Sequence, residues 1–126
     1  MCRWRRRGAG VLGHTCANDV SVRDLYERDR RRPRGKTFRT FCALGPYIET
    51  DLEPGALAIK SRLNGEFHQD DTTGRMQFNV AELIHHSSKV ITFNPGDVLL
   101  TGGYGSAQIH PGDMTEIEVG GYWRTA

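Results

Sequence analysis

A Gly-Lys-Thr tripeptide, Gly35–Thr37, is the pattern in this chain that most directly suggests chemistry. In phosphate-binding loops the lysine and the hydroxyl reach the phosphates and a magnesium ion, and another glycine stands five positions before the glycine of the tripeptide. Here that position is Arg30, inside a run of arginines. The tripeptide is therefore incomplete as a nucleotide site, and taken alone Lys36 is a surface lysine.

Two pairs of side chains have the types that ligate metals. His85 and His86 are adjacent, whereas two histidines that bind one metal from a helix stand four positions apart, so a solvated or interface pair is the better interpretation. Glu116 and Glu118 alternate, which on a strand places both on one face. They follow Gly112-Asp113 near the end of the chain, where alternating acids on a strand are ordinary surface residues.

Composition bounds the class of protein. The chain has 126 residues, which favours one domain, and its fifteen glycines indicate turns and short strands rather than a helical bundle. The cysteines are odd in number and form no Cys-x-x-Cys pair, which argues against a disulfide framework or a zinc ribbon and favours the reducing cytoplasm. We expect Cys16 and Cys42 to be small core residues; the third cysteine is Cys2.

Charge is distributed unevenly along the chain. Residues 1–40 carry twelve Arg or Lys against four Asp or Glu, and residues 41–126 carry five against eleven. A basic end suits nucleic acid, an anionic surface or anionic small substrates. Residues 1–10 are expected to be an unstructured or foreign start, with the domain over 11–126. No apolar run approaches the roughly 20 residues that a membrane span needs.

Turn and cap signals predict a β-rich chain with two short helices. Residues 57–63, Asn64-Gly65 and residues 66–69 predict a hairpin, because Asn-Gly tolerates positive φ at both positions of a type I′ turn. Asn79 and Glu82 predict a capping box opening a helix that runs through residue 89. The other expected elements are a strand over 11–17, a helix over 20–32 capped by Asn18 or Asp19, a turn at 94–97, and strands over 98–101 and 114–119.

Five segments carry a longer pattern. Residues 13–24 read Gly-His-Thr-Cys-Ala-Asn-Asp-Val-Ser-Val-Arg-Asp, and residues 35–46 read Gly-Lys-Thr-Phe-Arg-Thr-Phe-Cys-Ala-Leu-Gly-Pro. The others are Asn64-Gly65-Glu66 with Gln69, Thr73 and Met76, then Pro95–Gly102, then Gly112-Asp113. In this order they resemble the fumarylacetoacetate hydrolase family, whose first two signatures read Gly-Tyr-Thr, two small residues, Asn-Asp-x-Ser-Ala-Arg-Asp, and Gly-Lys-Ser-Phe-Asp-Thr-Phe-x-Pro-Leu-Gly-Pro. The resemblance covers residues 11–120.

The resemblance implies a mainly β fold with short helices (α+β), here a partial fumarylacetoacetase-like β-roll, and usually a homodimer. It also implies an enzyme that uses a divalent metal, Mg²⁺ or Mn²⁺, on small 2-oxo acids or acylpyruvates, including those of aromatic catabolism. Family reactions are carbon–carbon hydrolysis, decarboxylation, isomerisation and hydration. In each, the metal chelates the keto-acid oxygens and stabilises the enolate, and hard oxygen ligands suit magnesium.

Residue by residue, the resemblance makes Asp19 a metal carboxylate. Lys36 becomes a catalytic residue beside the metal, orienting its water or the substrate's negative charge. Arg23 is expected to pair with Asp24 and fix the signature loop. The positions that match residues near the metal or the substrate are Arg23, Thr40, Thr101 and Gly102.

The chain also departs from the family pattern. The family's other metal carboxylates are a Glu-x-Glu pair upstream of Asp19, and residues 1–12 contain no acid. The segment that supplies a His and a Glu as general acid and base has no counterpart either. Gly103 stands where the family has a Thr that contacts substrate, and Arg39 where many members have Asp. One carboxylate beside one lysine is a poor magnesium site, because affinity depends on ligand number.

Three functions remain open on the sequence alone. The first is a metal-dependent enzyme acting on a small 2-oxo acid. The second is a catalytically inactive, truncated family member that associates with a full-length partner or a related chain; exposed strand edges and apolar surface would accompany it. The third is a basic anion or nucleic-acid binder using residues 3–7 and 28–36, although these lack the interleaved aromatics of nucleic-acid binders.

Overall fold

The computed structural model describes residues 10–30, 32–103 and 105–125. The expected unstructured start, residues 1–10, therefore lies outside the described residues apart from Gly10, and it stays a prediction, as does Cys2. Within the described residues, no helix is long and apolar enough to cross a membrane.

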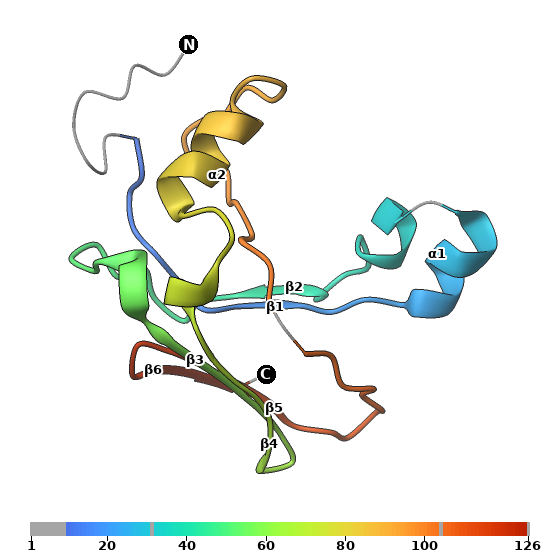
Figure 1. The fold of residues 1–126 in the computed structure, drawn as a ribbon. Coiled ribbons are helices and arrows are strands. Elements are labelled where there is room, and N and C mark those ends of the chain that lie inside the picture. Colours follow the sequence, from blue (N-terminus) through green and yellow to red (C-terminus); the bar gives the residue numbers. More distant parts are fainter. Residues whose placement is uncertain (1–9, 31, 104, 126) are drawn as a thin grey trace.

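Two antiparallel sheets form the fold (Figure 1). In the larger sheet the strands run in the order β4 (Glu66–Thr72), β3 (Ala58–Leu63), β5 (Thr115–Val119) and β6 (Tyr122–Thr125). In the smaller sheet β1 (Ala17–Asp19) pairs with β2 (Cys42–Leu44). The two sheets are joined by Asn18, whose Nδ2 donates to Thr115 Oγ1 at 3.2 Å. The expected mainly β, α+β fold is confirmed.

The β3–β4 hairpin matches the sequence prediction. Leu63 pairs with Glu66 across the two-residue turn, and φ is 52° at Asn64 and 84° at Gly65. Both values lie in the left-handed region that a type I′ turn requires. A Cβ at position 65 would meet no other atom within 4 Å. The positive φ, and not crowding, is therefore the reason that glycine is favoured here.

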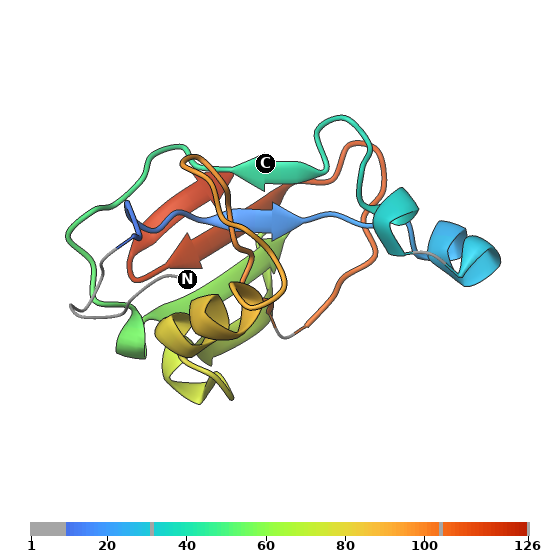
Figure 2. The same ribbon diagram turned by 90° about the horizontal axis from the view of Figure 1, so that it is seen from above.

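The two helices are short. α2 (Val80–Ser87) begins with the predicted capping box: Asn79 Oδ1 accepts from the Glu82 N–H, and Glu82 Oε2 accepts from the Asn79 N–H, both at 2.9 Å. α1 (Arg23–Asp29) lies at one end of the molecule, away from the larger sheet, in both views (Figure 2). Within the described residues there are also three 3₁₀ turns: η1 (Arg32–Gly35), η2 (Pro54–Ala56) and η3 (Thr73–Arg75).

The predicted start of the first helix is wrong. Asn18 and Asp19 belong to β1, where they pair with Ala43 and Cys42, so their backbone cannot also cap a helix. The N-cap of α1 is Val22, with no side-chain cap. The helix also ends earlier than predicted, because Arg30 adopts a left-handed φ of 51°.

Two predicted strands also differ. The strand expected over 11–17 is reduced to the first residue of β1, preceded by a single bridge between His14 and Glu49. Residues 98–101 form no strand, because no neighbouring segment pairs with their backbone among the described residues. The turn at 94–97 is confirmed by the Asp97 N–H donating to the Asn94 carbonyl at 3.1 Å.

The core is small. Among the described side chains, Cys16 is the buried hydrophobic, at 6% exposure. Cys42, expected in the core, is exposed instead, because it sits on an edge strand of the two-stranded sheet. Large apolar side chains that face solvent include Leu12, Phe67, Val90, Ile91 and Met114. The accessible surface of 9883 Å² compares with about 6,800 Å² for a compact monomer of this mass.

Candidate functional site

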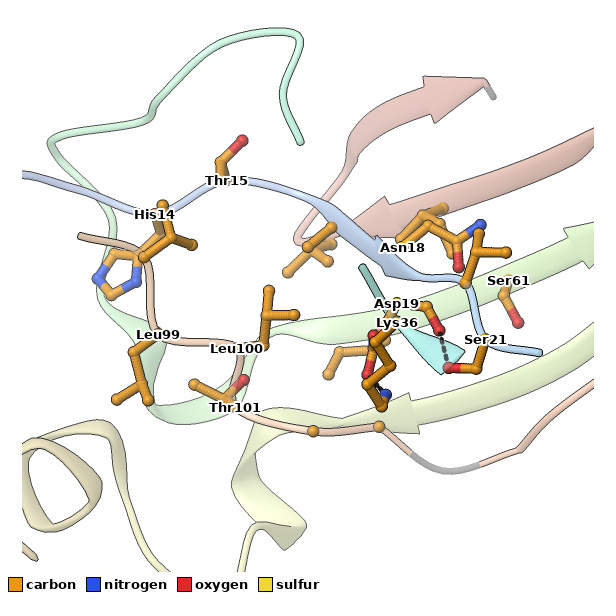
Figure 3. A pocket seen from close by; sticks show the side chains of 18 of the residues that line it. His14, Thr15, Asn18, Asp19, Ser21, Lys36, Ser61, Leu99, Leu100 and Thr101 are labelled. Atoms are coloured by element: carbon orange, nitrogen blue, oxygen red, sulfur yellow. Dashed lines mark hydrogen bonds and ion pairs between the residues drawn. The ribbon is translucent and has the colours of Figure 1, made fainter. Parts of the chain in front are cut away.

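A wide groove of about 2140 Å³ lies between β1, one face of the larger sheet and the segment that follows α2 (Figure 3). Ile59, Ser61 and Ile117 line it from the sheet, and Leu99 and Thr101 from the later segment. Ser61 interrupts the apolar alternation of its strand, so the sequence already marked this position as unusual.

Lys36 and Asp19 meet in this groove as the resemblance implied. The Val22 N–H donates to the Gly35 carbonyl at 2.9 Å, which brings η1 back to the end of β1. Gly35 is buried against Tyr26: a Cβ there would stand 2.3 Å from the ring and 2.6 Å from the Val22 carbonyl oxygen. Only glycine fits this approach, and it delivers the next residue, Lys36, to Asp19.

The Lys36 Nζ and Asp19 Oδ2 atoms form an ion pair, and Figure 3 shows the two side chains next to each other. The side chains are 36% and 49% exposed. Exposed pairs contribute at most about 1 kcal/mol to folding. Both groups can therefore exchange this contact for a bound ligand at small cost.

The other predicted site residues are divided between the groove and its surroundings. Thr101 and Gly102 line the groove, and Gly102 has a φ of 85° that favours glycine. Thr40 is exposed and is not among the groove-lining residues. Arg23 lines the groove, but the expected pair with Asp24 is wrong.

Arg23 instead donates to Glu27 at 2.9 Å. Residues four apart on a helix lie on one face, which brings the Arg23 and Glu27 side chains together. The pair therefore stabilises α1 itself rather than the signature loop.

Glu116 and Glu118 are placed away from the groove. Thr115, Ile117 and Val119 line it, so the two glutamates between them point to the opposite face of β5. Glu118 is buried, at 9% exposure, and β6 still follows this strand, so the interpretation as surface acids on a last strand is wrong for Glu118. The pair cannot supply ligands to the groove.

The metal-ligand types do not cluster in the described part of the chain. No group of three or more His, Cys, Asp or Glu side chains there could hold a metal ion. His85 and His86 are exposed on α2, with ring centroids 5.7 Å apart. Asp19, with its lysine partner, does not by itself fit a divalent ion that needs several oxygen ligands.

In the described part of the chain, hydrogen bonds lower the pKa of two carboxyl groups, Asp29 and Asp113. A hydrogen bond from Arg28 lowers the pKa of Asp29, and Arg34 acts in the same direction. These contacts partly neutralise the basic segment after α1. A hydrogen bond from Asn64 lowers the pKa of Asp113, and the His110 N–H acts in the same direction. Neither carboxyl lines the groove, so both contacts are structural.

The match to a known protein family includes all the signature segments identified in the sequence. The fumarylacetoacetate (FAA) hydrolase C-terminal family matches residues 8–125. The chain belongs to this family. Among solved members, a 2-hydroxyhepta-2,4-diene-1,7-dioate isomerase from Mycobacterium marinum is 37% identical with a TM-score of 0.87, over 90% of this chain and 46% of that one. A maleylpyruvate hydrolase from Sphingobium sp. SYK-6 is 28% identical with a TM-score of 0.80, over 90% and 42%.

A third fumarylacetoacetate hydrolase relative is the mitochondrial oxaloacetate tautomerase of Xenopus laevis. It is 44% identical over 97 residues, which are 73% of this chain and 30% of that protein. These relatives are enzymes named as isomerase, hydrolase and tautomerase. The chain spans about half the length, or less, of these three relatives and of the first curated relative it matches.

Proposed function

We propose that this chain provides part of the active site of an enzyme acting on small 2-oxo acids or acylpyruvate-type acids. The observation that carries the proposal is the Asp19–Lys36 pair in a groove lined also by Thr101 and Gly102. The relatives named above act, by their names, on acids of this kind. The proposed reaction is carbon–carbon hydrolysis, decarboxylation, isomerisation or hydration. We also propose that the protein forms a homodimer and works in the cytoplasm.

The groove residues of this chain are suited to binding the substrate of such a reaction. The Lys36 ammonium is a mobile point charge that can leave Asp19 and pair with a substrate carboxylate. Asp19 would then be free to accept from water or to contribute one ligand to a metal. The Thr101 hydroxyl, on the same groove, can donate to a second substrate oxygen.

A divalent metal, Mg²⁺ or Mn²⁺, belongs to this proposal, since family members are generally metal-dependent. The described residues bring Asp19 into the groove without the further carboxylates that such an ion needs. We therefore place the remaining ligands outside the described residues of this chain, on another polypeptide segment.

Calorimetric titration tests the proposal. Magnesium or manganese is titrated into the 126-residue chain with oxalate or pyruvate present, and the parent is compared with Asp19→Ala. Weak binding by the parent, with Asp19 and the oxalate oxygens as ligands, that disappears in Asp19→Ala is the expected result. Asp51→Ala is the matched control, because Asp51 is exposed and does not line the groove. Equal binding by the parent and Asp19→Ala would refute Asp19 as a ligand.

A second candidate function is an inactive family member that associates with a longer relative. The exposed apolar side chains and the open groove favour it, because large apolar patches mark association sites. Mixing the chain with a full-length family member, such as the M. marinum isomerase, distinguishes the two in sedimentation. A mixed complex without added turnover supports the second candidate, whereas added turnover in the mixture supports the enzyme.

A further inference from the structure

Three side chains form a row across the sheet floor of the groove. Ser61 on β3 pairs with Gln69 on β4 and with Ile117 on β5, and directly opposed residues of antiparallel strands share a face. All three line the groove. Gln69 therefore points into the same space as the Asp19–Lys36 pair, from the edge strand of the sheet.

The amide nitrogen of Gln69 is buried without a partner. Within the described residues, Gln69 Nε2 is the buried side-chain nitrogen or oxygen that has no hydrogen-bond partner. Such a donor loses its bonds to water and gains nothing in return. Orphaned groups of this kind are few in folded proteins and call for a specific explanation.

Gly103 and Gly105 lie close to Gln69. A Cβ on Gly103 would stand 3.9 Å from Gln69 Nε2 and 4.0 Å from Oε1, and one on Gly105 would stand 3.8 Å from Gln69 Cβ. These are ordinary contact distances, so Gly103 could carry a side chain without collision. Because it carries none, no side chain at position 103 stands between the groove and the Gln69 carboxamide.

We infer that Gln69 is a substrate-binding residue: its carboxamide N–H donates to an oxygen of the bound acid in the space beside Gly103. The inference rests on the proposed function. A 2-oxo acid anion presents only acceptor oxygens, so it needs donors around it. Lys36 supplies a charged donor in the groove, and Gln69 supplies a neutral one from the sheet floor. The bound acid then provides an acceptor for Gln69 Nε2, which has no partner among the described residues.

Oxalate is the probe, titrated by calorimetry into the full chain in the presence of magnesium. Gln69→Met keeps the length of the side chain but removes the donor, and we expect oxalate affinity to fall about tenfold or more, as for a hydrogen bond to a charged group. Gln69→Glu places a carboxylate against the anion and should lower the affinity further. Asp70→Asn is the control, because Asp70 is the next residue of β4 and does not line the groove.

Melting without ligand separates this role from a structural one. Removing an orphaned donor relieves an unmet bond, so Gln69→Met should melt at the same temperature as the parent or higher. A lower melting temperature, or loss of cooperative melting, would overturn the inference because the amide would then support the fold. Unchanged oxalate affinity in Gln69→Met would also overturn it and leave the proposed function standing. No oxalate binding by the parent chain would overturn both.

Discussion

At the scale of single residues, the Asp19–Lys36 pair is held together by backbone geometry. β1 fixes Asp19 through its pairing with Cys42, and the Val22–Gly35 hydrogen bond fixes the residue before Lys36. The side chains are partly exposed, so their mutual attraction contributes little to stability. The pair is better suited to ligand exchange than to supporting the fold.

Replacing Lys36 by Met should therefore separate binding from stability. We expect Lys36→Met to lower the free energy of unfolding by less than about 1 kcal/mol and to abolish oxalate binding. Urea denaturation measures the first effect and calorimetry the second. Lys60→Met, on β3 and outside the groove lining, is the control for removing a positive charge. A large loss of stability with binding intact would contradict the assigned role of Lys36.

The Asp113 carboxyl should make stability depend on acid. Its pKa is lowered from 3.8 by the hydrogen bond from Asn64 and then by the His110 N–H. The folded chain thus releases this proton more readily than the unfolded chain, so the stabilisation is present above the unfolded pKa and is lost as pH falls through the lowered pKa. Asp113→Asn should be less stable than the parent at neutral pH, with the difference shrinking in acid. Urea midpoints across the acid range test this, and a constant difference would contradict it.

At the scale of elements, local signals predicted some pieces well. The Asn64-Gly65 hairpin and the Asn79 capping box each depend on residues a few positions apart, and both are present. The predicted start of α1 was wrong because Asn18 and Asp19 pair with Ala43 and Cys42 in the β1–β2 sheet. Local sequence propensity does not include such a distant strand partner.

In the candidate site, too, some features could be predicted from the sequence and others depend on distant contacts. The resemblance brought Asp19 and Lys36 together correctly, because the signature fixes their segments. It could not reveal Gln69 as an unpartnered donor, since that depends on the distant Gly103 lying over β4. The missed Arg23–Glu27 pair follows from helix periodicity, once the helix is placed correctly.

The capping box predicts a measurable cost. Asn79→Ala removes the side-chain oxygen that accepts from the Glu82 N–H, and we expect a loss of about 1 kcal/mol in the free energy of unfolding. Asn79→Asp keeps a capping oxygen and should be close to the parent. Chemical denaturation measures both variants. Equal losses in the two would show that the cap oxygen is not what stabilises α2.

Two glycines should respond to alanine for different reasons. At Gly35 a Cβ would meet the Tyr26 ring and the Val22 carbonyl, so Gly35→Ala should displace η1 and weaken oxalate binding as well as stability. At Gly65 the surroundings are open and only the φ of 84° resists. Gly65→Ala should cost about 1 kcal/mol and leave oxalate binding unchanged. Retained binding in Gly35→Ala would contradict the role of η1 in placing Lys36.

At the scale of the whole molecule, several large apolar side chains are exposed to solvent. Leu12 and Val90 are 76% and 84% exposed, and the groove opens the sheet interior to solvent. We expect the chain to sediment as a dimer or larger species, or to co-sediment with a related chain, and to bind a hydrophobic dye strongly. Sedimentation velocity over a range of concentrations is the measurement. A monodisperse monomer that melts cooperatively would contradict the prediction.

The order of the strands in the larger sheet has a consequence for how the chain is made. β3 and β4 are neighbours in sequence, but β5, which completes the other side of β3, follows only after η3 and α2. Asn64 bonds to Asp113 across 49 positions and accepts from Met114 across 50. Local hairpins close in microseconds, whereas distant strand pairs wait on loop closure. During synthesis one edge of β3 therefore stays open until residues 115–119 leave the ribosome. In refolding followed by pulsed hydrogen exchange, the β3 amides that donate to β5 should become protected later than those that donate to β4.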